Sequence, residues 1–531
     1  MKNTFLCNAN GPIVNTKYGK LRGFLFNDVY NFWGVRYAVA RRFEEPREQL
    51  PWAGIKDALA YGYISPKLGN PLPDNELTVP HRYWIQGEDC LNLNVATPTI
   101  DPSAKKPVMV WFHGGGYSDG SAIEHIAFEG DNMARYHDVV MVVVNHRLNV
   151  FGFLDLSDFG EKYKNSGNAG IADLVAALKW VKENIEAFGG DPDNVTIFGQ
   201  SGGGGKVNTL GQTPAADGLF QKAIVMSGVF KKGTVKGYPE VSHREFTEYM
   251  LDSLGLAKDD IEGLKKVSLP VFTLIANRAV AHFGKEGRTV NWGPHKNDWY
   301  LGDPLENGFR NHFKQIPTII GTTLGEFLYP ELDKNIVEMS EDEQRKLVAD
   351  KYGEEYADKV ISLFKKAYPG KAIGFAYLSD SMVRLGSVEY AKLKSIGEHA
   401  PVYSYILSAV YDLSAGMTAW HNCDIPYAFA NAERIPYCCS TPNWEQLSFA
   451  IPAAFSAFAH TGNPDVDGLP HWSCATSSAV PTMIYDDVIE VKTGHDTEFT
   501  EYISSIEKPV EFSWRMPKDD EDEEEKHAWR Y

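Results

Sequence analysis

The segment around Ser201 constrains the fold more than any other part of the chain. The apolar run 195–198 leads into Gly199-Gln200-Ser201-Gly202-Gly203, and residues 206–210 follow it. This order predicts a strand, a sharp turn and a helix, with the serine hydroxyl held clear of the backbone at the turn. Glycines flank the serine because a Cβ at either position would block so tight a turn. Ser201 is therefore a candidate nucleophile.

A second serine, Ser118, carries the same G-x-S-x-G pattern within residues 116–120. The apolar run 108–112 ends in a glycine-rich loop before Ser118 is reached, so Ser118 does not directly follow a strand. The strand-turn-helix setting favours Ser201 as the nucleophile and assigns Ser118 to the loop.

The wider sequence alternates between strand and helix patterns. This alternation predicts an α/β protein with a mostly parallel, twisted sheet and helices on both of its faces. Neither an internal repeat nor a linker marks a boundary, so we expect one domain over 1–515, with helical, cap-like insertions at about 242–313 and 340–400. An acidic tail, 516–531, would follow. The supporting segments are strands 108–112, 139–145, 195–198, 223–226, 316–320 and 402–407, and a helix over 171–187.

Composition restricts the partners of the chain. A formal net charge of −18 argues against nonspecific nucleic-acid binding, which needs a basic surface. No apolar run approaches the roughly 18 residues of a membrane span, and the first residues lack the apolar core of a secretory signal. The six cysteines match neither a zinc site nor a disulfide scaffold. We therefore expect a cytoplasmic protein with reduced cysteines and no membrane partner, either monomeric or homodimeric.

A serine nucleophile needs a base, and the base needs an orienting acid. In this type of fold the acid and then the histidine follow the serine along the chain. His421 is favoured because it lies in a loop after the predicted strand 402–407, at the sheet edge where catalytic groups gather. His460 falls at the end of an apparent helix. Position alone does not decide among the late histidines, which are His399, His421, His460, His471, His495 and His527.

Glu326 is the leading candidate for the acid. It follows the predicted strand 316–320 in a glycine-containing turn with apolar neighbours, where a carboxylate needs a partner. An exposed glutamate at the start of a helix is the alternative interpretation. Asp424 is a rival acid, but it lies very close in sequence to His421.

The run His113-Gly114-Gly115-Gly116 follows a predicted buried strand. Consecutive glycines allow backbone N–H groups to converge on one point without side-chain obstruction, as stabilisation of a developing oxyanion requires. Gly115, Gly116 and Gly202, the residue after the nucleophile, would together supply three donors. A flexible glycine-rich turn is the alternative.

Several ordered blocks give the chain a resemblance to the type-B carboxylesterases, the family that includes the cholinesterases. The resemblance implies an α/β-hydrolase fold, a catalytic triad of Ser201, Glu326 and His421, and oxyanion donors at Gly115, Gly116 and Gly202. It also implies hydrolysis of a small or medium carboxylic ester through an acyl-enzyme, without a metal or organic cofactor. The blocks extend over nearly the whole chain and are 88–95, 145–154, 189–203 and 218–224.

The chain departs from this family pattern in three ways. Family members usually have alanine after the serine, whereas Gly202 opens a run of four glycines. Secreted relatives pair the cysteine equivalent to Cys90 with an upstream cysteine that residues 63–66 lack, so Cys90 is expected to be free. No block matches the choline-binding aromatic site, and Trp84 is interpreted as a packing residue.

Two further possibilities remain open from the sequence. The same triad would also serve an amide, carbamate, lactone or thioester, because specificity depends on the pocket walls. Some relatives with this fold serve in adhesion, so a non-catalytic binding protein is the alternative of another class. Candidate wall residues, which could equally be core residues of the insertions, are Phe283, Trp292, Trp299 and Tyr300.

Overall fold

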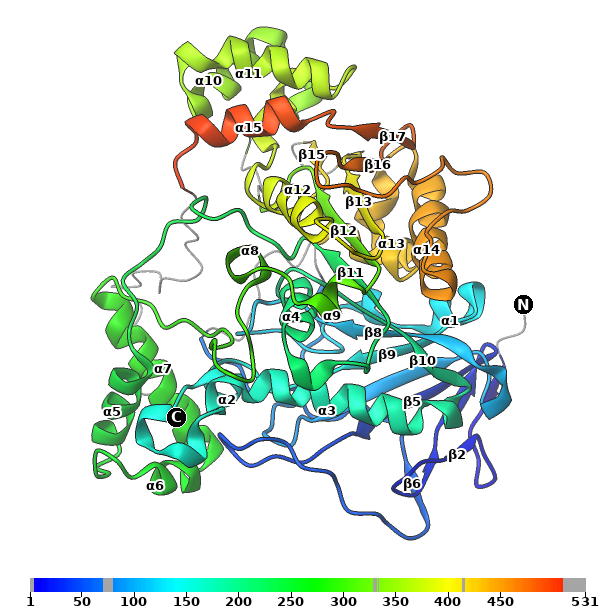
Figure 1. Cartoon of the computed structure of the whole chain (residues 1–531), viewed down its shortest axis with the longest axis vertical. Coiled ribbons are helices and arrows are strands. Elements are labelled where there is room, and N and C mark those ends of the chain that lie inside the picture. The colour runs from blue at the N-terminus through cyan, green and yellow to red at the C-terminus, as the bar shows by residue number, and fades with distance from the viewer. Residues whose placement is uncertain (1–3, 70–79, 328–331, 333, 413–415, 510–531) are drawn as a thin grey trace.

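The computed structural model describes residues 4–69, 80–327, 332, 334–412 and 416–509. Its centre is a large sheet (Figure 1), 12-stranded within these ranges. In spatial order the strands are β1 (Phe5–Leu6), β4 (Phe24–Phe26), β5 (Val29–Arg36), β7 (Asn92–Thr97), β9 (Val140–Val144), β8 (Lys106–Phe112), β10 (Gly190–Gln200), β11 (Lys222–Met226), β12 (Thr318–Thr323), β13 (Val402–Leu407), β16 (Pro481–Tyr485) and β17 (Glu490–Thr493).

The strands from β9 to β16 pair in parallel, whereas the pairs toward both outer edges are antiparallel. The predicted mostly parallel sheet is confirmed. Two smaller sheets accompany it: β2 (Ile13–Asn15), β3 (Lys20–Arg22) and β6 (Ile55–Asp57) form one, and β14 (Val410–Tyr411) and β15 (Met417–Thr418) form the other.

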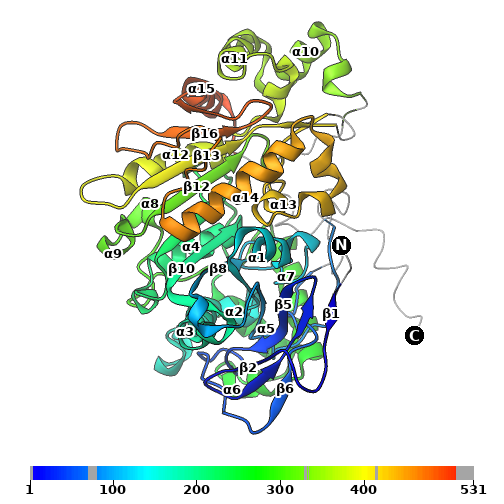
Figure 2. The ribbon, with the colours of Figure 1, turned by 90° about the vertical axis from the view of Figure 1, so that its right-hand side faces the viewer.

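Helices cover both faces of the central sheet. Alternate residues of β8 point to opposite faces: Val108 and Val110 belong to one buried cluster, Met109 and Trp111 to the other. The first cluster packs against α3 (Ala169–Asn184), α4 (Gly202–Gly211) and α12 (Met382–Lys394). The second packs against α1 (Asp131–His137), α13 (Ile425–Ala428) and α14 (Trp444–Thr461), which lie in front of the sheet in Figure 2.

The two predicted insertions form structure of their own at opposite ends of the molecule (Figure 1). In the first, α5 (His243–Ser253), α6 (Ile261–Lys266) and α7 (Leu269–Lys285) share a core with the short α2 (Asn149–Phe153). In the second, α10 (Glu341–Tyr352) and α11 (Glu354–Ala367) share a core with α15 (Thr497–Ile506). The short α8 (Pro304–Asn307) and α9 (Asn311–Lys314) complete the helices of the first insertion.

The domain boundaries stay a prediction. The second insertion does not lie wholly outside the core, because α12 packs on β12 and β13 of the central sheet. The predicted acidic tail, 516–531, lies outside the described residues. Within the described ranges, no helix is both long and apolar enough to cross a membrane.

Candidate active site

Ser201 occupies the predicted strand-turn-helix junction, between β10 and α4. Its backbone is strained, with φ 58° and ψ −127°, a conformation that L-residues other than glycine rarely adopt. The Ser201 N–H donates to Met226 O of the neighbouring strand at 2.8 Å. A Cβ at Gly199 would collide with the backbone of Gly203, and a Cβ at Gly203 with that of Phe112. The flanking glycines are therefore required by close backbone approach.

Glu326 and His421 meet, although 95 residues separate them. His421 Nδ1 lies 2.5 Å from Glu326 Oε2, and the His421 N–H donates to Glu326 O at 2.7 Å. Glu326 Oε1 accepts hydrogen bonds from Ser227 Oγ and from Thr323 N, each at 2.8 Å. The carboxyl is thus buried and satisfied at both oxygens, so the alternative of an exposed helix-opening glutamate is wrong.

The rival residues are engaged elsewhere. Asp424 accepts a hydrogen bond from Tyr405 OH at 2.6 Å. His460 is exposed on α14, with Nε2 3.2 Å from His137 O. His471 Nδ1 pairs with Asp465 at 2.8 Å. Of the late histidines that the structure describes, His421 is the one that pairs with Glu326.

Burial opposes ionisation of both groups of the pair, whereas the hydrogen bonds from Thr323 N and Ser227 Oγ favour the carboxylate form of Glu326. Removal from water lowers the pKa of His421 and raises the pKa of the Glu326 carboxyl, because a low-dielectric interior disfavours both charged forms. His421 Nε2 is buried, and within the described part of the chain it has no hydrogen-bond partner. A neutral imidazole with a free Nε2 is the form that can accept a proton.

The structure brings the backbone of His421 close to Ser201. The side-chain amide of Gln200, the residue before Ser201, donates to His421 O. On its other side, His421 N is bound to Glu326 O. No hydrogen bond joins Ser201 Oγ to His421 Nε2 in the described structure; such bonds are often long without substrate and tighten only when it binds.

Sequence reasoning missed Gln200 and Ser227. Both lie where a strand ends, Gln200 as the last residue of β10 and Ser227 directly after β11. Ligand sites of parallel sheets form at these carboxyl ends. Polar residues at the ends of the strands flanking the nucleophile were therefore the signal that could have found them.

The predicted glycine loop packs directly on the serine turn. An ideal Cβ at Gly114 would lie 3.5 Å from Ser201 Cβ, and one at Gly202 would overlap the backbone of Gly116. Gly115 and Gly116 have φ values of 79° and 62°, which glycine adopts readily. Within the described part of the chain, no group accepts a hydrogen bond from the N–H of Gly115 or Gly116.

The neighbouring Ser118 helps to hold this loop through its backbone. Its N–H donates to Gly115 O at 3.2 Å, and its carbonyl accepts from Asn149 Nδ2 at 3.0 Å. This arrangement agrees with the assignment of Ser118 to the loop.

Aromatic side chains that sequence reasoning did not single out lie beside His421. The rings of Phe327 and His421 are 3.7 Å apart between centroids, and Phe230 stacks on Phe327 at 6.0 Å. Phe230 is 38% exposed, so this pair offers an apolar surface next to His421. The four candidate wall residues belong instead to buried cores. Phe283 and Trp292 pack in the core of α5 to α7. Trp299 packs against the first buried cluster of the central sheet, and Tyr300 is buried.

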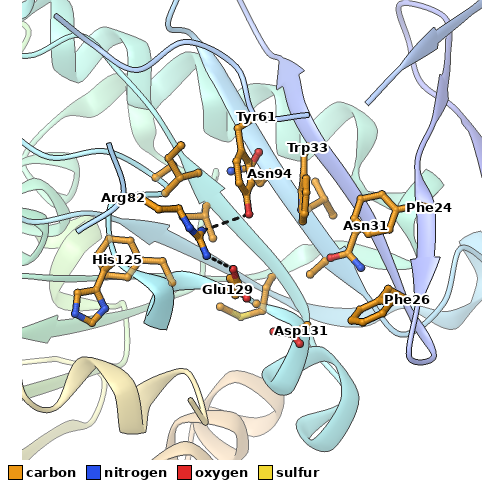
Figure 3. A pocket seen from close by; sticks show the side chains of 18 of the residues that line it. Phe24, Phe26, Asn31, Trp33, Tyr61, Arg82, Asn94, His125, Glu129 and Asp131 are labelled. Atoms are coloured by element: carbon orange, nitrogen blue, oxygen red, sulfur yellow. Dashed lines mark hydrogen bonds and ion pairs between the residues drawn. The ribbon is translucent and has the colours of Figure 1, made fainter. Parts of the chain in front are cut away.

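A separate cavity lies between the sheet and the segment leading into α1 (Figure 3). Arg82 crosses it to bond Glu129 and lies 3.5 Å from Tyr61 OH. None of its lining residues is a predicted site residue.

Comparison with known proteins identifies the family of the chain. The model of the carboxylesterase family matches residues 10–502, so the chain belongs to the carboxylesterase family of the α/β-hydrolase superfamily. It is a carboxylic ester hydrolase, as the resemblance implied.

The relatives cover nearly the whole chain. Para-nitrobenzyl esterase of Bacillus subtilis is 33% identical over 497 aligned residues, and the alignment covers 92% of this chain and 97% of that protein. Phenmedipham hydrolase of Pseudarthrobacter oxydans is 28% identical, covering 91% and 95%. A solved esterase of Clostridium hathewayi that can hydrolyse aliphatic aromatic polyesters is 43% identical, covers 95% of this chain and 100% of its own, and superposes with a TM-score of 0.90.

Proposed function

We propose that the protein hydrolyses small or medium carboxylic esters through an acyl-enzyme, with Ser201 as nucleophile, His421 as base and Glu326 as orienting acid. The observation that carries this proposal is the 2.5 Å contact between Glu326 Oε2 and His421 Nδ1. With Glu326 ionised, this contact favours the tautomer in which Nδ1 carries the proton and Nε2 is free to accept one.

In the first half-reaction, Ser201 Oγ attacks the ester carbonyl carbon while its proton passes to His421 Nε2. The carbonyl oxygen becomes an oxyanion, stabilised by the N–H groups of Gly115, Gly116 and Gly202. The imidazolium then gives its proton to the alkoxy oxygen, the carbon–oxygen bond breaks, and the alcohol leaves the acyl-enzyme.

In the second half-reaction, water attacks the acyl carbon and gives a proton to His421. The tetrahedral intermediate collapses, His421 returns the proton to Ser201 Oγ, and the carboxylic acid is released. Burial, which lowers the pKa of His421, makes the imidazolium a ready proton donor in both collapse steps. The cycle uses no metal or organic cofactor, so chelator treatment should leave the rate unchanged.

Replacement of the nucleophile tests the assignment. S201A is expected to abolish hydrolysis of p-nitrophenyl butyrate while the circular dichroism spectrum stays that of the wild type. Ser478→Ala, an exposed serine far along the chain, is the control and should keep full activity. Retained turnover in S201A would remove Ser201 from the mechanism.

Substrate class and the alternative of a binding protein need separate tests. A phosphonylating reagent followed by peptide mass mapping should label Ser201 and not Ser118, whereas a non-catalytic binding protein would show no label. A panel of p-nitrophenyl esters of increasing acyl length should be hydrolysed faster than an amide, carbamate, lactone or thioester. Phenmedipham and an aliphatic aromatic polyester belong in the panel because the relatives named above act on them.

We also propose a cytoplasmic location. All six cysteines are unpaired, as is usual for proteins of a reducing compartment. Titration of the denatured, unreduced protein should find six thiols, and fewer would contradict this location.

A further inference from the structure

Lys206 is a buried lysine directly beneath the candidate active site. It lies on α4, five residues after Ser201, and its side chain has no exposure to solvent. Its Nζ donates to His113 O at 2.9 Å and lies 3.5 Å from Gly114 O. A buried ammonium is costly unless its charge is compensated. Here the compensation comes from carbonyls of the glycine loop.

Carboxylates contribute only from a distance. Glu124 and Asp119 attract the ammonium through longer-range charge interactions, and Asp119 is already paired with Lys67 at 2.9 Å. Lys206 forms no ion pair within the described ranges. The rings of His113 and His146 also face this region, stacked 5.0 Å apart.

The aromatic and imidazole groups nearest to Lys206 remain uncharged. Burial holds the pKa of both histidines well below the usual value, so they are neutral. The Tyr117 ring lies 5.9 Å from Nζ. The ammonium is therefore the positive charge that directly contacts the loop carbonyls.

The carbonyls of His113, Gly114 and Gly115 each have a donor on the protein side. His113 Nδ1 lies 3.0 Å from Gly114 O, which Lys206 also approaches. Ser118 N and Asp119 N donate to Gly115 O at 3.2 and 3.0 Å. In a trans peptide the C=O and the following N–H point in opposite directions. Fixing Gly114 O therefore directs the Gly115 N–H away from these donors, and fixing Gly115 O does the same for the Gly116 N–H.

We propose that Lys206 is a positioning residue of the esterase: its ammonium holds the peptide planes of residues 113–115 so that the Gly115 N–H faces the oxyanion, and it strengthens that donor. The inference rests on the proposed function, because it assigns Lys206 to the oxyanion hole of that mechanism. Hydrogen bonds in a chain polarise one another, so an ammonium on the carbonyl side of a peptide makes its N–H a stronger donor. The charge lies behind the loop, and its attraction for a developing negative oxygen on the other side adds to that of the N–H groups.

The chain supplies a matched control in Lys394, the last residue of α12. Its side chain is equally buried, and its Nζ donates to Phe313 O at 2.5 Å and to Ile316 O at 3.0 Å. Burial lowers the pKa of both lysines to about 7. Ile316 precedes β12, so Lys394 lies at the amino edge of the sheet, whereas Ser201 follows the carboxyl end of β10.

The test compares K206M and K394M at about pH 6, where both ammonium groups of the wild type are charged. K206M is expected to lower kcat for p-nitrophenyl butyrate by about 10- to 100-fold, less than the loss of a whole oxyanion donor, with KM within about threefold. Its affinity for a trifluoromethyl ketone, which forms an oxyanion on Ser201, should fall by a similar factor. K394M should lose similar thermal stability but keep kcat within about twofold.

K206Q separates orientation from charge and guards against failure of K206M to fold. The glutamine amide can donate to a carbonyl but carries no charge, so its kcat should fall between those of K206M and the wild type. If folded K206M or K206Q keeps wild-type kcat and ketone affinity, or if K394M loses as much activity as K206M, the inference is overturned. S201A tests the proposed function separately. If S201A is inactive while K206M is fully active, the role of Lys206 is rejected and the proposed triad is unaffected.

Discussion

Replacement of Glu326 by glutamine tests the orientation of the base atom by atom. Glu326 Oε1 accepts from Thr323 N and from Ser227 Oγ, while Oε2 faces His421 Nδ1. The Thr323 N–H can only donate, so the amide oxygen of glutamine must take the place of Oε1. The glutamine NH₂ group then takes the place of Oε2 opposite His421 Nδ1. Because an NH₂ group can only donate, Nδ1 must act as the hydrogen-bond acceptor. His421 would carry its proton on Nε2, where it cannot take the proton of Ser201.

The structure gives the size of this effect. The opposite amide orientation restores the correct tautomer but sets the NH₂ against the buried Thr323 N–H, which costs about 1–3 kcal/mol for an unsatisfied donor. This orientation is therefore held by roughly one molecule in 5 to 150. E326Q also removes the negative charge that stabilises the imidazolium. Together we expect a loss of about 10³- to 10⁴-fold in kcat/KM, or about 4–5.5 kcal/mol in barrier height.

The assay is kcat/KM for p-nitrophenyl butyrate, with circular dichroism to show that the variant is folded. D424N is the matched control because Asp424 is the nearby buried acid that bonds Tyr405 OH instead of His421. An asparagine amide oxygen still accepts from that hydroxyl, so D424N should keep activity within about threefold. An E326Q variant that retains more than about a tenth of wild-type kcat/KM would refute the reasoning.

Two other substitutions probe the site and the fold. G202A should lower kcat by about 100-fold, because the added Cβ overlaps the backbone of Gly116 and must displace the oxyanion loop; wild-type kcat would contradict this. D496N leaves Arg384, which bonds Asp496 at 2.7 and 3.0 Å, as a buried unpaired charge, and should reduce the free energy of unfolding in urea by about 3–5 kcal/mol at pH 7. Because the Arg384 pair lowers the pKa of Asp496 to about 2, its contribution is present above about pH 4 and is lost as the pH falls toward 2, so the difference between D496N and wild type should shrink over that range.

Local sequence patterns predicted the strands and helices of the site, but not which side chains contact one another. The apolar run 195–198 with its flanking glycines predicted the turn at Ser201, and β10 and α4 confirm it. Chain order favoured Glu326 and His421, yet the residues around Glu326 did not exclude an exposed glutamate at the start of a helix. Its burial depends on β11 and β13 lying beside β12. This adjacency of distant segments is not written in any short window of sequence.

The physical reason for the run of glycines after Ser201 also depends on contacts between distant segments. Position 202 holds glycine where family members usually have alanine. The residues next to it in the sequence do not explain this difference. In the structure the backbone of Gly116 occupies the space that a Cβ at Gly202 would need, and Tyr117 OH lies 3.0 Å from an ideal Cβ at Gly205. The closeness of the oxyanion loop to α4 is therefore the physical reason for glycine at these positions.

Backbone strain gathers at the carboxyl ends of three neighbouring strands. Ser201, Ser227 and Glu326, which follow β10, β11 and β12, have φ values of 58°, 45° and 39°. Each such conformation costs of order 1–3 kcal/mol in a residue other than glycine, and persists only where its surroundings hold it.

Hydrogen bonds between neighbouring parallel strands hold two of these strained residues in place. Ser201 N donates to Met226 O at the end of β11, and Ser227 N donates to Gly321 O of β12, each at 2.8 Å. Ser201 and Ser227 are thus each bound to the next strand of a sheet that is buried on both faces, whereas Glu326 is held by Thr323 and by the backbone of His421. Rigid strands can maintain strained ends that an isolated loop would relax, so the sheet and its two cores hold Ser201, Ser227 and Glu326 in these conformations.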